Sequence, residues 1–85
     1  MSVHNGHRER MRQEFLSGGL AHFSEPRVLE LLLFYAIPRR DTNPIAHALL
    51  EQFGSLSGVL EAPVSALAQV PGMVENVATL LQLVT

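Results

Sequence analysis

The sequence predicts an all-α domain, a small bundle of five to six helices that includes paired helical hairpins. Apolar residues recur at helical spacing, and proline and glycine separate the helical segments. No stretch alternates apolar and polar residues as a half-buried strand would. The 85 residues leave room for one domain. We divide it into an N-terminal basic helix and linker over residues 1–23 and a helical core over residues 24–85.

The first helix is predicted over residues 7–17. Asn5 is a reasonable N-cap for it, because a short polar side chain can accept a hydrogen bond from a free N–H of the first turn. Gly18 and Gly19 follow and end the helix, since glycine accepts the left-handed conformation at this position.

The next segment predicts the central core helix. Ser24 can cap it, and Pro26 fits the first turn, where its missing N–H is not needed. Residues 28–37 are apolar nearly throughout, so this helix is buried on most sides. Pro38 stops it.

A third helix begins with Asn43 as its N-cap and Pro44 in its first position, and Gly54 closes it. Its apolar residues recur at helical spacing along one face. Three shorter helices are predicted to follow, over residues 56–61, 64–69 and 75–84, with a tight turn at residues 70–74.

The composition fits a folded protein of a reducing compartment. Hydrophobic residues make up 47% and charged residues 16%, unlike a disordered chain. The absence of cysteine excludes disulfides and thiolate metal sites. No apolar stretch is long enough to span a membrane, and the polar N-terminus does not resemble a signal peptide. We therefore expect a cytoplasmic protein that does not contact the membrane.

Charge is distributed unevenly along the chain. The formal net charge is −2 and the isoelectric point about 6.0, which argues against avid nucleic-acid binding. However, all six basic residues are arginines and none follows position 40. An anion would therefore meet the N-terminal half, unless backbone N–H groups bind it. Arginine favours planar, bidentate contacts over point-charge attraction.

Residues 67–78 resemble a helix-hairpin-helix motif. Gly72 lets the backbone turn with positive φ, Met73 fills the space between two helices, and the small Ala78 lets them approach closely. In the nucleic-acid-binding versions of this motif, backbone N–H groups and the positive end of the second helix face one phosphate. The resemblance therefore makes Gly72, Met73, Val74 and Asn76 candidate phosphate contacts.

The hairpin departs from the binding pattern at two positions. Val74 stands where a second glycine is usual, and its branched side chain obstructs a phosphate. Glu75 follows it and repels one. The alternative interpretation is that this hairpin only contributes to packing.

Three further stretches, residues 4–10, 29–46 and 53–60, closely resemble the N-terminal region of the RadC family. The resemblance implies a helix-hairpin-helix-like domain ahead of a C-terminal JAB/MPN domain with a zinc-metalloprotease-like site. The His-x-His and downstream Asp pattern of that second domain's site does not occur in this sequence. The resemblance also implies the family's label of DNA repair.

A second candidate site lies between the predicted second and third helices. Arg39 and Arg40 directly precede a helix N-terminus at which Thr42 and Asn43 offer donors. Guanidinium groups beside free N–H groups suit a phosphate. The alternative is a solvated turn in which either arginine pairs with Asp41 or a glutamate.

Arg8 and Arg12 share one face of the first helix and could flank a DNA backbone. The alternative is a solvated helix surface partly neutralised by glutamates. The four histidines have no cysteine near them and no HExxH pattern, so we expect no metal. No nucleophile–base pair or carboxylate pair is evident, so we expect no catalytic residue and no cofactor.

Two functions are consistent with these patterns. The first is a non-catalytic accessory domain that binds DNA weakly through backbone phosphates, without reading sequence. The second is a protein-interaction or oligomerisation module, such as a homodimer, that positions a JAB/MPN domain. The acidic second half of the chain and its high apolar content motivate the second function.

Overall fold

The computed structural model describes residues 3–38 and 40–84, with the backbone alone for residues 3–5. The candidate Arg39 lies outside the described residues. Within them the chain forms six α-helices and no strand, which confirms the predicted all-α class. The helices are α1 (Val3–Gly18), α2 (Glu25–Phe34), α3 (Asn43–Phe53), α4 (Leu56–Glu61), α5 (Val64–Leu67) and α6 (Glu75–Leu83).

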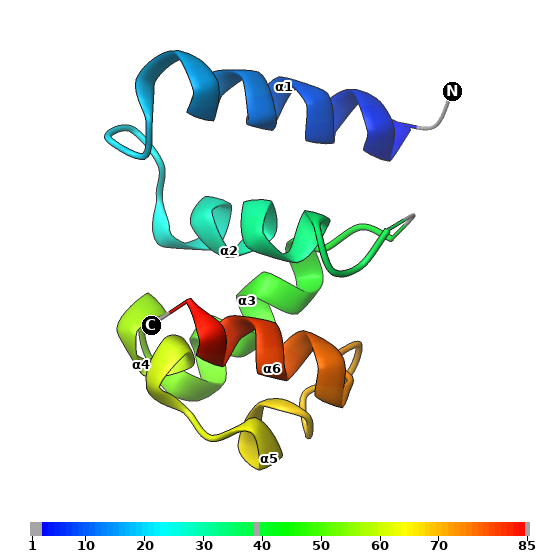
Figure 1. Ribbon diagram of the computed structural model, residues 1–85, viewed down its shortest axis with the longest axis vertical. Helices are drawn as coiled ribbons and strands as arrows, with labels where there is room; N and C mark the ends of the chain where they lie inside the picture. The colour runs from blue at the N-terminus through cyan, green and yellow to red at the C-terminus, as the bar shows by residue number, and fades with distance from the viewer. Residues whose placement is uncertain (1–2, 39, 85) are drawn as a thin grey trace.

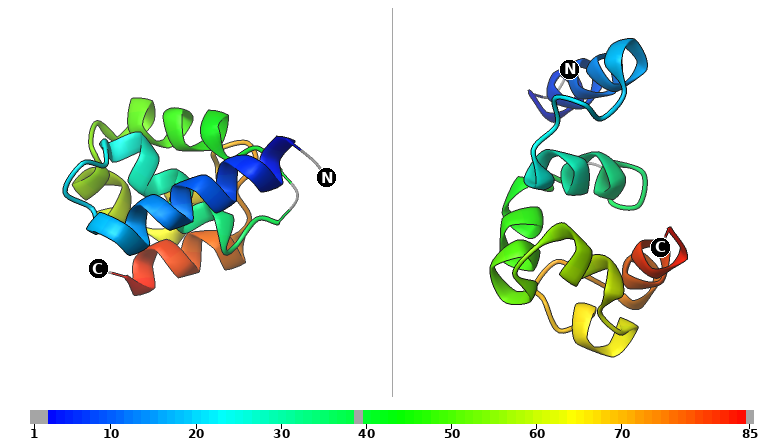
Figure 2. Two further views of the ribbon diagram at one scale, coloured as in Figure 1. Left: turned by 90° about the horizontal axis from the view of Figure 1, so that it is seen from above. Right: turned by 90° about the vertical axis from the view of Figure 1, so that its left-hand side faces the viewer.

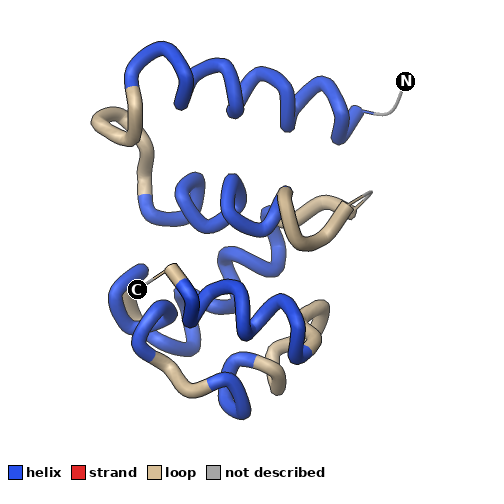
Figure 3. The backbone as a smooth tube through the Cα atoms, viewed as in Figure 1, coloured by secondary structure: helices blue, strands red, loops and turns tan. Residues whose placement is uncertain are grey.

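The helices are arranged in tiers (Figure 1). α1 forms an outer layer over α2, and α3 runs from α2 toward a lower tier of α4, α5 and α6. The side view in Figure 2 shows α3 joining these tiers along one side of the molecule. Figure 3 shows that the longer connections precede α2, α3 and α6. The principal extents are 33 × 28 × 21 Å.

The core lies between α2 and the lower helices. Ala46 of α3 and Ala78 of α6 are fully buried, and their small side chains let neighbouring helices approach closely. The cluster also contains larger apolar residues from every helix except α1: Leu29, Leu33, Ile45, Leu49, Val59, Leu67, Val77 and Leu81. Since burying one such side chain contributes about 1.5–3 kcal/mol, this cluster is the main source of stability.

The N-terminal ends of α1 and α2 differ from the sequence predictions. α1 begins at Val3, so the prediction of Asn5 as its N-cap is wrong. A single glycine costs a helix only about 1 kcal/mol, so Gly6 does not interrupt it. Ser24 takes the N-cap position of α2 with extended backbone, but its side chain makes no capping hydrogen bond.

The C-terminal ends of three helices also lie earlier than predicted. α2 ends at Phe34 because the backbone tightens into i→i+3 hydrogen bonds, from Tyr35 to Leu32 and from Ala36 to Leu33. The following Pro38 disfavours helical backbone at the residue before it. The last helical residues of α5 and α6 also precede the predicted ends, as is common where helix termini fray.

Thr42, and not the predicted Asn43, takes the N-cap position of α3, but its side chain makes no capping hydrogen bond. Asn43 is the first helical residue, and its N–H donates to Oδ1 of Asp41 at 3.0 Å. The Asp41 carboxylate therefore accepts the capping hydrogen bond in place of the Thr42 side chain. Pro44 lies in the first turn of the helix.

The described part of the chain has no helix with both the length and the apolar character needed to cross a membrane.

The turn before α6 packs against α3 at Gly72, which joins the helical pair α2–α3 to the helical pair α5–α6. Gly72 has φ +92°, and Met73 beside it is buried as predicted. A Cβ atom at Gly72 would lie 2.8 Å from Cδ1 and 2.9 Å from Cγ1 of Ile45 in α3. Glycine is therefore required here for its conformation and for its lack of a side chain.

We expect Gly72→Ala to lower the free energy of unfolding by about 1–3 kcal/mol, because alanine is strained at positive φ and its methyl group meets Ile45. Urea unfolding measures the change. Gly18→Ala is the matched control, since Gly18 is helical with nothing within 4 Å of an added Cβ. It should raise stability by about 0.5–1 kcal/mol. An equal response of both variants would contradict this explanation.

Candidate nucleic-acid interface

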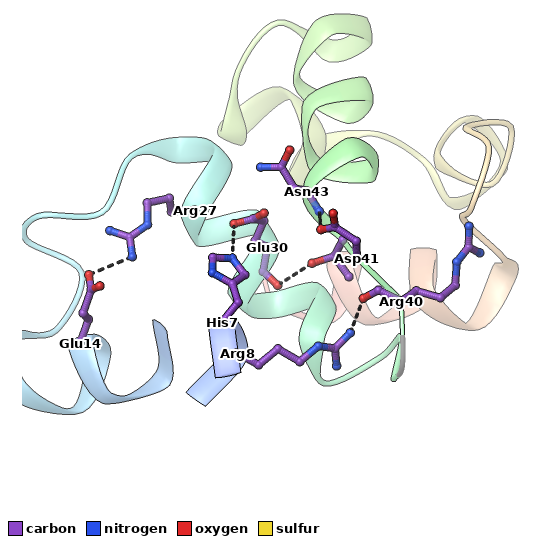
Figure 4. A network of polar contacts seen from close by, with 9 residues as sticks. His7, Arg8, Glu14, Arg27, Glu30, Arg40, Asp41 and Asn43 are labelled. Atoms are coloured by element: carbon purple, nitrogen blue, oxygen red, sulfur yellow. Dashed lines mark hydrogen bonds and ion pairs between the residues drawn. The ribbon is translucent and has the colours of Figure 1, made fainter. Parts of the chain in front are cut away.

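Arg40 lies in the turn between α2 and α3, and its side chain extends toward the turn before α6. Its Nη2 atom is 3.8 Å from the point that a Cβ atom at Gly72 would occupy. Figure 4 shows the guanidinium reaching over the neighbouring loop. The structure thus brings together two candidates that lie 32 residues apart in the sequence. Among the described residues, the Arg40 guanidinium has no hydrogen-bond or ion-pair partner.

Thr42 is the candidate whose placement differs most from the prediction. It is fully buried, and its hydroxyl donates to the Glu30 carbonyl oxygen at 3.4 Å. Its side chain therefore joins α3 to α2 and does not face a ligand, which corrects its assignment as a phosphate donor.

Asn43 has an exposed side chain but an occupied N–H, because the Asp41 carboxylate accepts from it at 3.0 Å. Pro44, the next residue, has no N–H. The α3 N-terminus therefore already holds an anion, and its backbone offers little to a phosphate.

The turn before α6 places its four candidates differently. Gly72 is half-buried. Met73 is buried, and its N–H donates to the carbonyl oxygen of Val70 at 3.0 Å. Val74 is 59% exposed and Asn76 is exposed. The first N–H groups of a helix have no partner within it, and the first intrahelical donor of α6 is Ala78. The Glu75 carboxyl group lies at the same helix end and offsets its positive potential.

Arg8, predicted as a flank for DNA, faces the protein. Its guanidinium donates to three carbonyl oxygens, those of Phe34 at 3.0 Å and of Ile37 and Arg40 at 2.6 Å each. It also lies 4.8 Å from the centre of the Phe34 ring. These donors are therefore used at the carboxyl end of α2 and in the turn that follows. Figure 4 shows the bond to Arg40.

Arg12, the other predicted flank, is paired within α1. Its guanidinium donates to both carboxylate oxygens of Glu9 at 2.8–3.2 Å. This hydrogen bond from Arg12 holds the pKa of Glu9 below its ordinary value, and a second one from Gln13 acts in the same direction. The Arg12 charge is therefore offset at neutral pH. Its pair supports the alternative interpretation of a solvated helix surface.

A histidine–glutamate contact also joins α1 to α2. His7 Nε2 lies 3.6 Å from Oε2 of Glu30, a carboxylate that is only 3% exposed. The His7 ring meets the Phe34 ring edge-on, with their centres 5.9 Å apart. Sequence reasoning missed this contact because Glu30 interrupts an apolar run without a local partner. The His4 side chain lies outside the described residues.

Two other polar contacts were missed, and both link distant segments. Glu25 Oε1 accepts from the Leu56 N–H at 2.8 Å and ties the start of α2 to the start of α4. Arg27 donates to Glu14 at 2.9 Å and lies 4.7 Å from the Phe23 ring centre, which ties α2 to the end of α1. No local sequence pattern could have identified either partner.

An apolar groove lies away from these polar groups. It has a volume of about 420 Å³ and lies between α1, α2, α4 and the end of α6. Its lining is apolar and aromatic and includes Phe15, Leu20, Leu32, Tyr35, Leu60 and Val84. Four of these residues are large and exposed, so the groove opens to solvent.

Two curated bacterial relatives are similar to most of this chain. It is 47% identical over 78 residues to UPF0758 protein FN0909 of Fusobacterium nucleatum, and 47% identical over 77 residues to UPF0758 protein SPO0054 of Ruegeria pomeroyi. The alignments cover 92% and 91% of this chain. The chain is homologous to part of the UPF0758 proteins. UPF0758 is the family name for RadC-like proteins, so the predicted resemblance is confirmed at that level.

The chain spans about a third of the length of these UPF0758 relatives, 34% in each case. No family model and no solved structure matches it.

We expect Arg12→Ala to raise the pKa of Glu9 toward its ordinary value, because the variant removes the hydrogen bond that stabilises the carboxylate. An NMR pH titration of the side-chain carboxyl carbons measures this shift. Since the folded pKa is lowered, the pair stabilises α1 above the ordinary carboxyl pKa. This contribution is lost as the pH falls through the folded value.

Arg10→Ala is the control, because Arg10 is an exposed neighbour on α1, whereas the side chains that donate to Glu9 are those of Arg12 and Gln13. A larger rise in the pKa of Glu9 from this variant than from Arg12→Ala would contradict the assignment.

Proposed function

We propose that this chain is a non-catalytic accessory domain of a RadC-like protein that binds the DNA backbone weakly and without sequence readout. Homology to UPF0758 proteins supports the RadC-like context. The helix-hairpin-helix interpretation of residues 67–78 supports DNA as the ligand. In this proposal, a C-terminal JAB/MPN domain of the whole protein carries any metalloprotease-like chemistry, and the role is linked to DNA repair.

The position of Arg40 beside Gly72 is the observation that carries this proposal. It places a guanidinium without a partner among the described residues next to the turn that leads into α6. A phosphate at this point would accept a charge-assisted hydrogen bond from Arg40 and face the free N–H groups of the helix end. The side chains of Asn43 and Asn76, at the starts of α3 and α6, are exposed and carry neutral donors.

Three features keep the proposed binding weak. The Asp41 carboxylate already occupies the α3 N-terminus, and Glu75 lies at the start of α6. The exposed side chain of Val74 leaves less room for a phosphate beside the turn. The described helix richest in arginine is α1, and its exposed Arg12 and Gln13 are hydrogen-bonded to Glu9, so it does not present free donors for base readout in series. The proposed ligand is therefore the sugar–phosphate backbone alone.

We expect Arg40→Ala to weaken binding to a short duplex about tenfold at low salt, the equivalent of one charge-assisted hydrogen bond of about 1.4 kcal/mol. The slope of log K against log salt should become shallower by about 1, since one phosphate contact is lost. Fluorescence anisotropy with duplex, single-stranded and branched DNA at several salt concentrations measures both.

Arg27→Ala is the control, because it removes the same charge from an arginine that pairs with Glu14 on another part of the surface. It should leave the slope unchanged. A wild-type protein that does not bind DNA at low salt, or equal effects of both variants, would refute the proposal.

We propose a second candidate function, self-association through the apolar groove. Phe15, Leu20, Tyr35 and Val84 line it and are 39%, 47%, 72% and 47% exposed. At roughly 200 Å² for a fully exposed aromatic side chain, and less for leucine and valine, the four present somewhat under about 400 Å² of largely apolar surface. A standard interface buries about 800 Å² per partner, so the groove would supply somewhat under half of it. The proposed partner is a second copy of the chain, because a two-fold axis would bring the same four apolar residues of both copies together.

This candidate predicts a weak homodimer that Leu20→Glu converts to a monomer, because the new charge would be buried at the interface. Sedimentation equilibrium measures the dissociation constant. Val74→Glu is the control, since it adds the same charge to an exposed apolar residue outside the groove and should leave the dimer intact. A wild type that stays monomeric at high concentration, or dissociation by Val74→Glu alone, would refute it.

A further inference from the structure

The segment that carries Arg40 is held from outside by α1. α2 ends at Phe34, and its last carbonyl groups have no partner within the helix. The chain then passes through the turn before α3 begins at Asn43. Arg8 of α1 reaches across and donates to the carbonyl oxygens of Phe34, Ile37 and Arg40. One side chain therefore ties both ends of the turn to a different helix.

The bond to the Arg40 carbonyl is the important one for the proposed site. It measures 2.6 Å and fixes the backbone from which the Arg40 side chain extends toward Gly72 (Figure 4). The Thr42 hydroxyl adds a longer bond of 3.4 Å on the far side of Arg40. The position of the Arg40 guanidinium thus depends on a contact made by a residue 32 positions earlier.

We propose that Arg8 is a positioning residue: by docking α1 onto the turn between α2 and α3, it holds Arg40 beside Gly72. This inference rests on the proposed function in that the held group is the one proposed to bind phosphate. Arg8 itself is half-buried, and three of its five N–H donors are already used by carbonyl oxygens. It acts on an anion through Arg40 and does not contact the anion.

The geometry of this contact requires arginine. A planar guanidinium has five N–H donors in a fixed fork and can reach three separated carbonyls at once. Here Nη1 holds the Phe34 carbonyl while Nη2 holds those of Ile37 and Arg40. A lysine ammonium carries the same charge on a single nitrogen atom, at the end of a side chain that is one bond shorter, and cannot hold all three. Arg8→Lys therefore removes the positioning and keeps the charge, which separates the two effects.

α1 has other attachments that should survive this substitution. Met11 is buried at 1% exposure, His7 meets Glu30, and Glu14 pairs with Arg27. Loss of the Arg8 fork should therefore loosen the turn without unfolding the domain. Far-UV circular dichroism and thermal unfolding of Arg8→Lys check that the fold is retained.

The first measurement needs no ligand. We expect Arg8→Lys to speed amide hydrogen exchange about fivefold at Ile37 and Asn43, which flank Arg40 in the turn, by loss of about one hydrogen bond's stabilisation. Arg12→Lys is the matched control, since it makes the same change one turn later on the same helix and should leave these amides at the wild-type rate. Unchanged exchange in Arg8→Lys would refute the positioning role, whether or not the protein binds DNA.

The second measurement uses the short duplex. Arg8→Lys should weaken binding about fivefold with an unchanged salt slope, because no phosphate contact is lost. Arg40→Ala, by contrast, changes the slope. If Arg8→Lys binds as the wild type does while Arg8→Ala does not, Arg8 acts only through its charge and the inference fails. It also fails if Arg8→Ala changes the slope as Arg40→Ala does, since Arg8 would then contact a phosphate itself.

Met11→Ala tests the role of α1 by a different route. It truncates the one side chain of α1 that is both apolar and buried among the described residues, and it leaves every charge in place. Faster exchange at Ile37 and Asn43 in this variant is expected if α1 docking holds the turn. Wild-type exchange there, with α1 itself exchanging faster, would show that the turn is ordered without α1 and would overturn the inference. If the wild type does not bind the duplex, the proposed function fails, and the exchange data still decide the role of Arg8.

Discussion

The contact between Gly72 and Ile45 is the constraint on which the arrangement of the two helical pairs depends. A left-handed turn without a side chain lets Ile45 of α3 approach the backbone before α6 more closely than any Cβ atom would allow. Met73 is buried beside it, so the turn belongs to the core as well as to the surface. The same approach brings the turn before α3, with Arg40, alongside the turn before α6. Packing in the core and the geometry of the candidate interface therefore have one origin.

α1 is attached to this core by different physics. It adds only Met11 to the buried residues that the structure describes, and Met11 is not part of the central cluster. Hydrogen bonds from Arg8, the contacts of His7 with Glu30 and Phe34, and the pairing of Glu14 with Arg27 add further attachment. Hydrophobic burial is non-directional, whereas a guanidinium fork requires its carbonyl partners in particular places. The attachment of α1 is consequently sensitive to the conformation of the turn in a way that an apolar contact would not be.

Local signals made the core helices predictable from the sequence. Pro26, Pro44 and Gly54 mark helix ends by their own backbone chemistry, and apolar spacing indicates the buried faces. The candidate interface was harder, because its geometry depends on contacts between distant residues. The carbonyl partners of Arg8 lie 26 to 32 residues away, and an arginine's sequence neighbours do not identify them. The burial of Thr42 was missed for a related reason, since threonine before a helix is equally typical of an exposed cap.

The number of arginines overstates how strongly this domain can attract an anion. Three of those that the structure describes have partners: Arg8 on carbonyl oxygens, Arg12 on Glu9 and Arg27 on Glu14. The positive potential at the N-terminal ends of α3 and α6, next to the candidate site, is also offset by the carboxylates of Asp41 and Glu75. Arg12 and Arg27 are ion-paired and the formal net charge of the chain is −2, so long-range attraction for an anion is small and binding depends on short-range geometry. The affinity of such a site is then set by how precisely its unpaired guanidinium is held, and the residues that hold it matter more than the net charge of the chain.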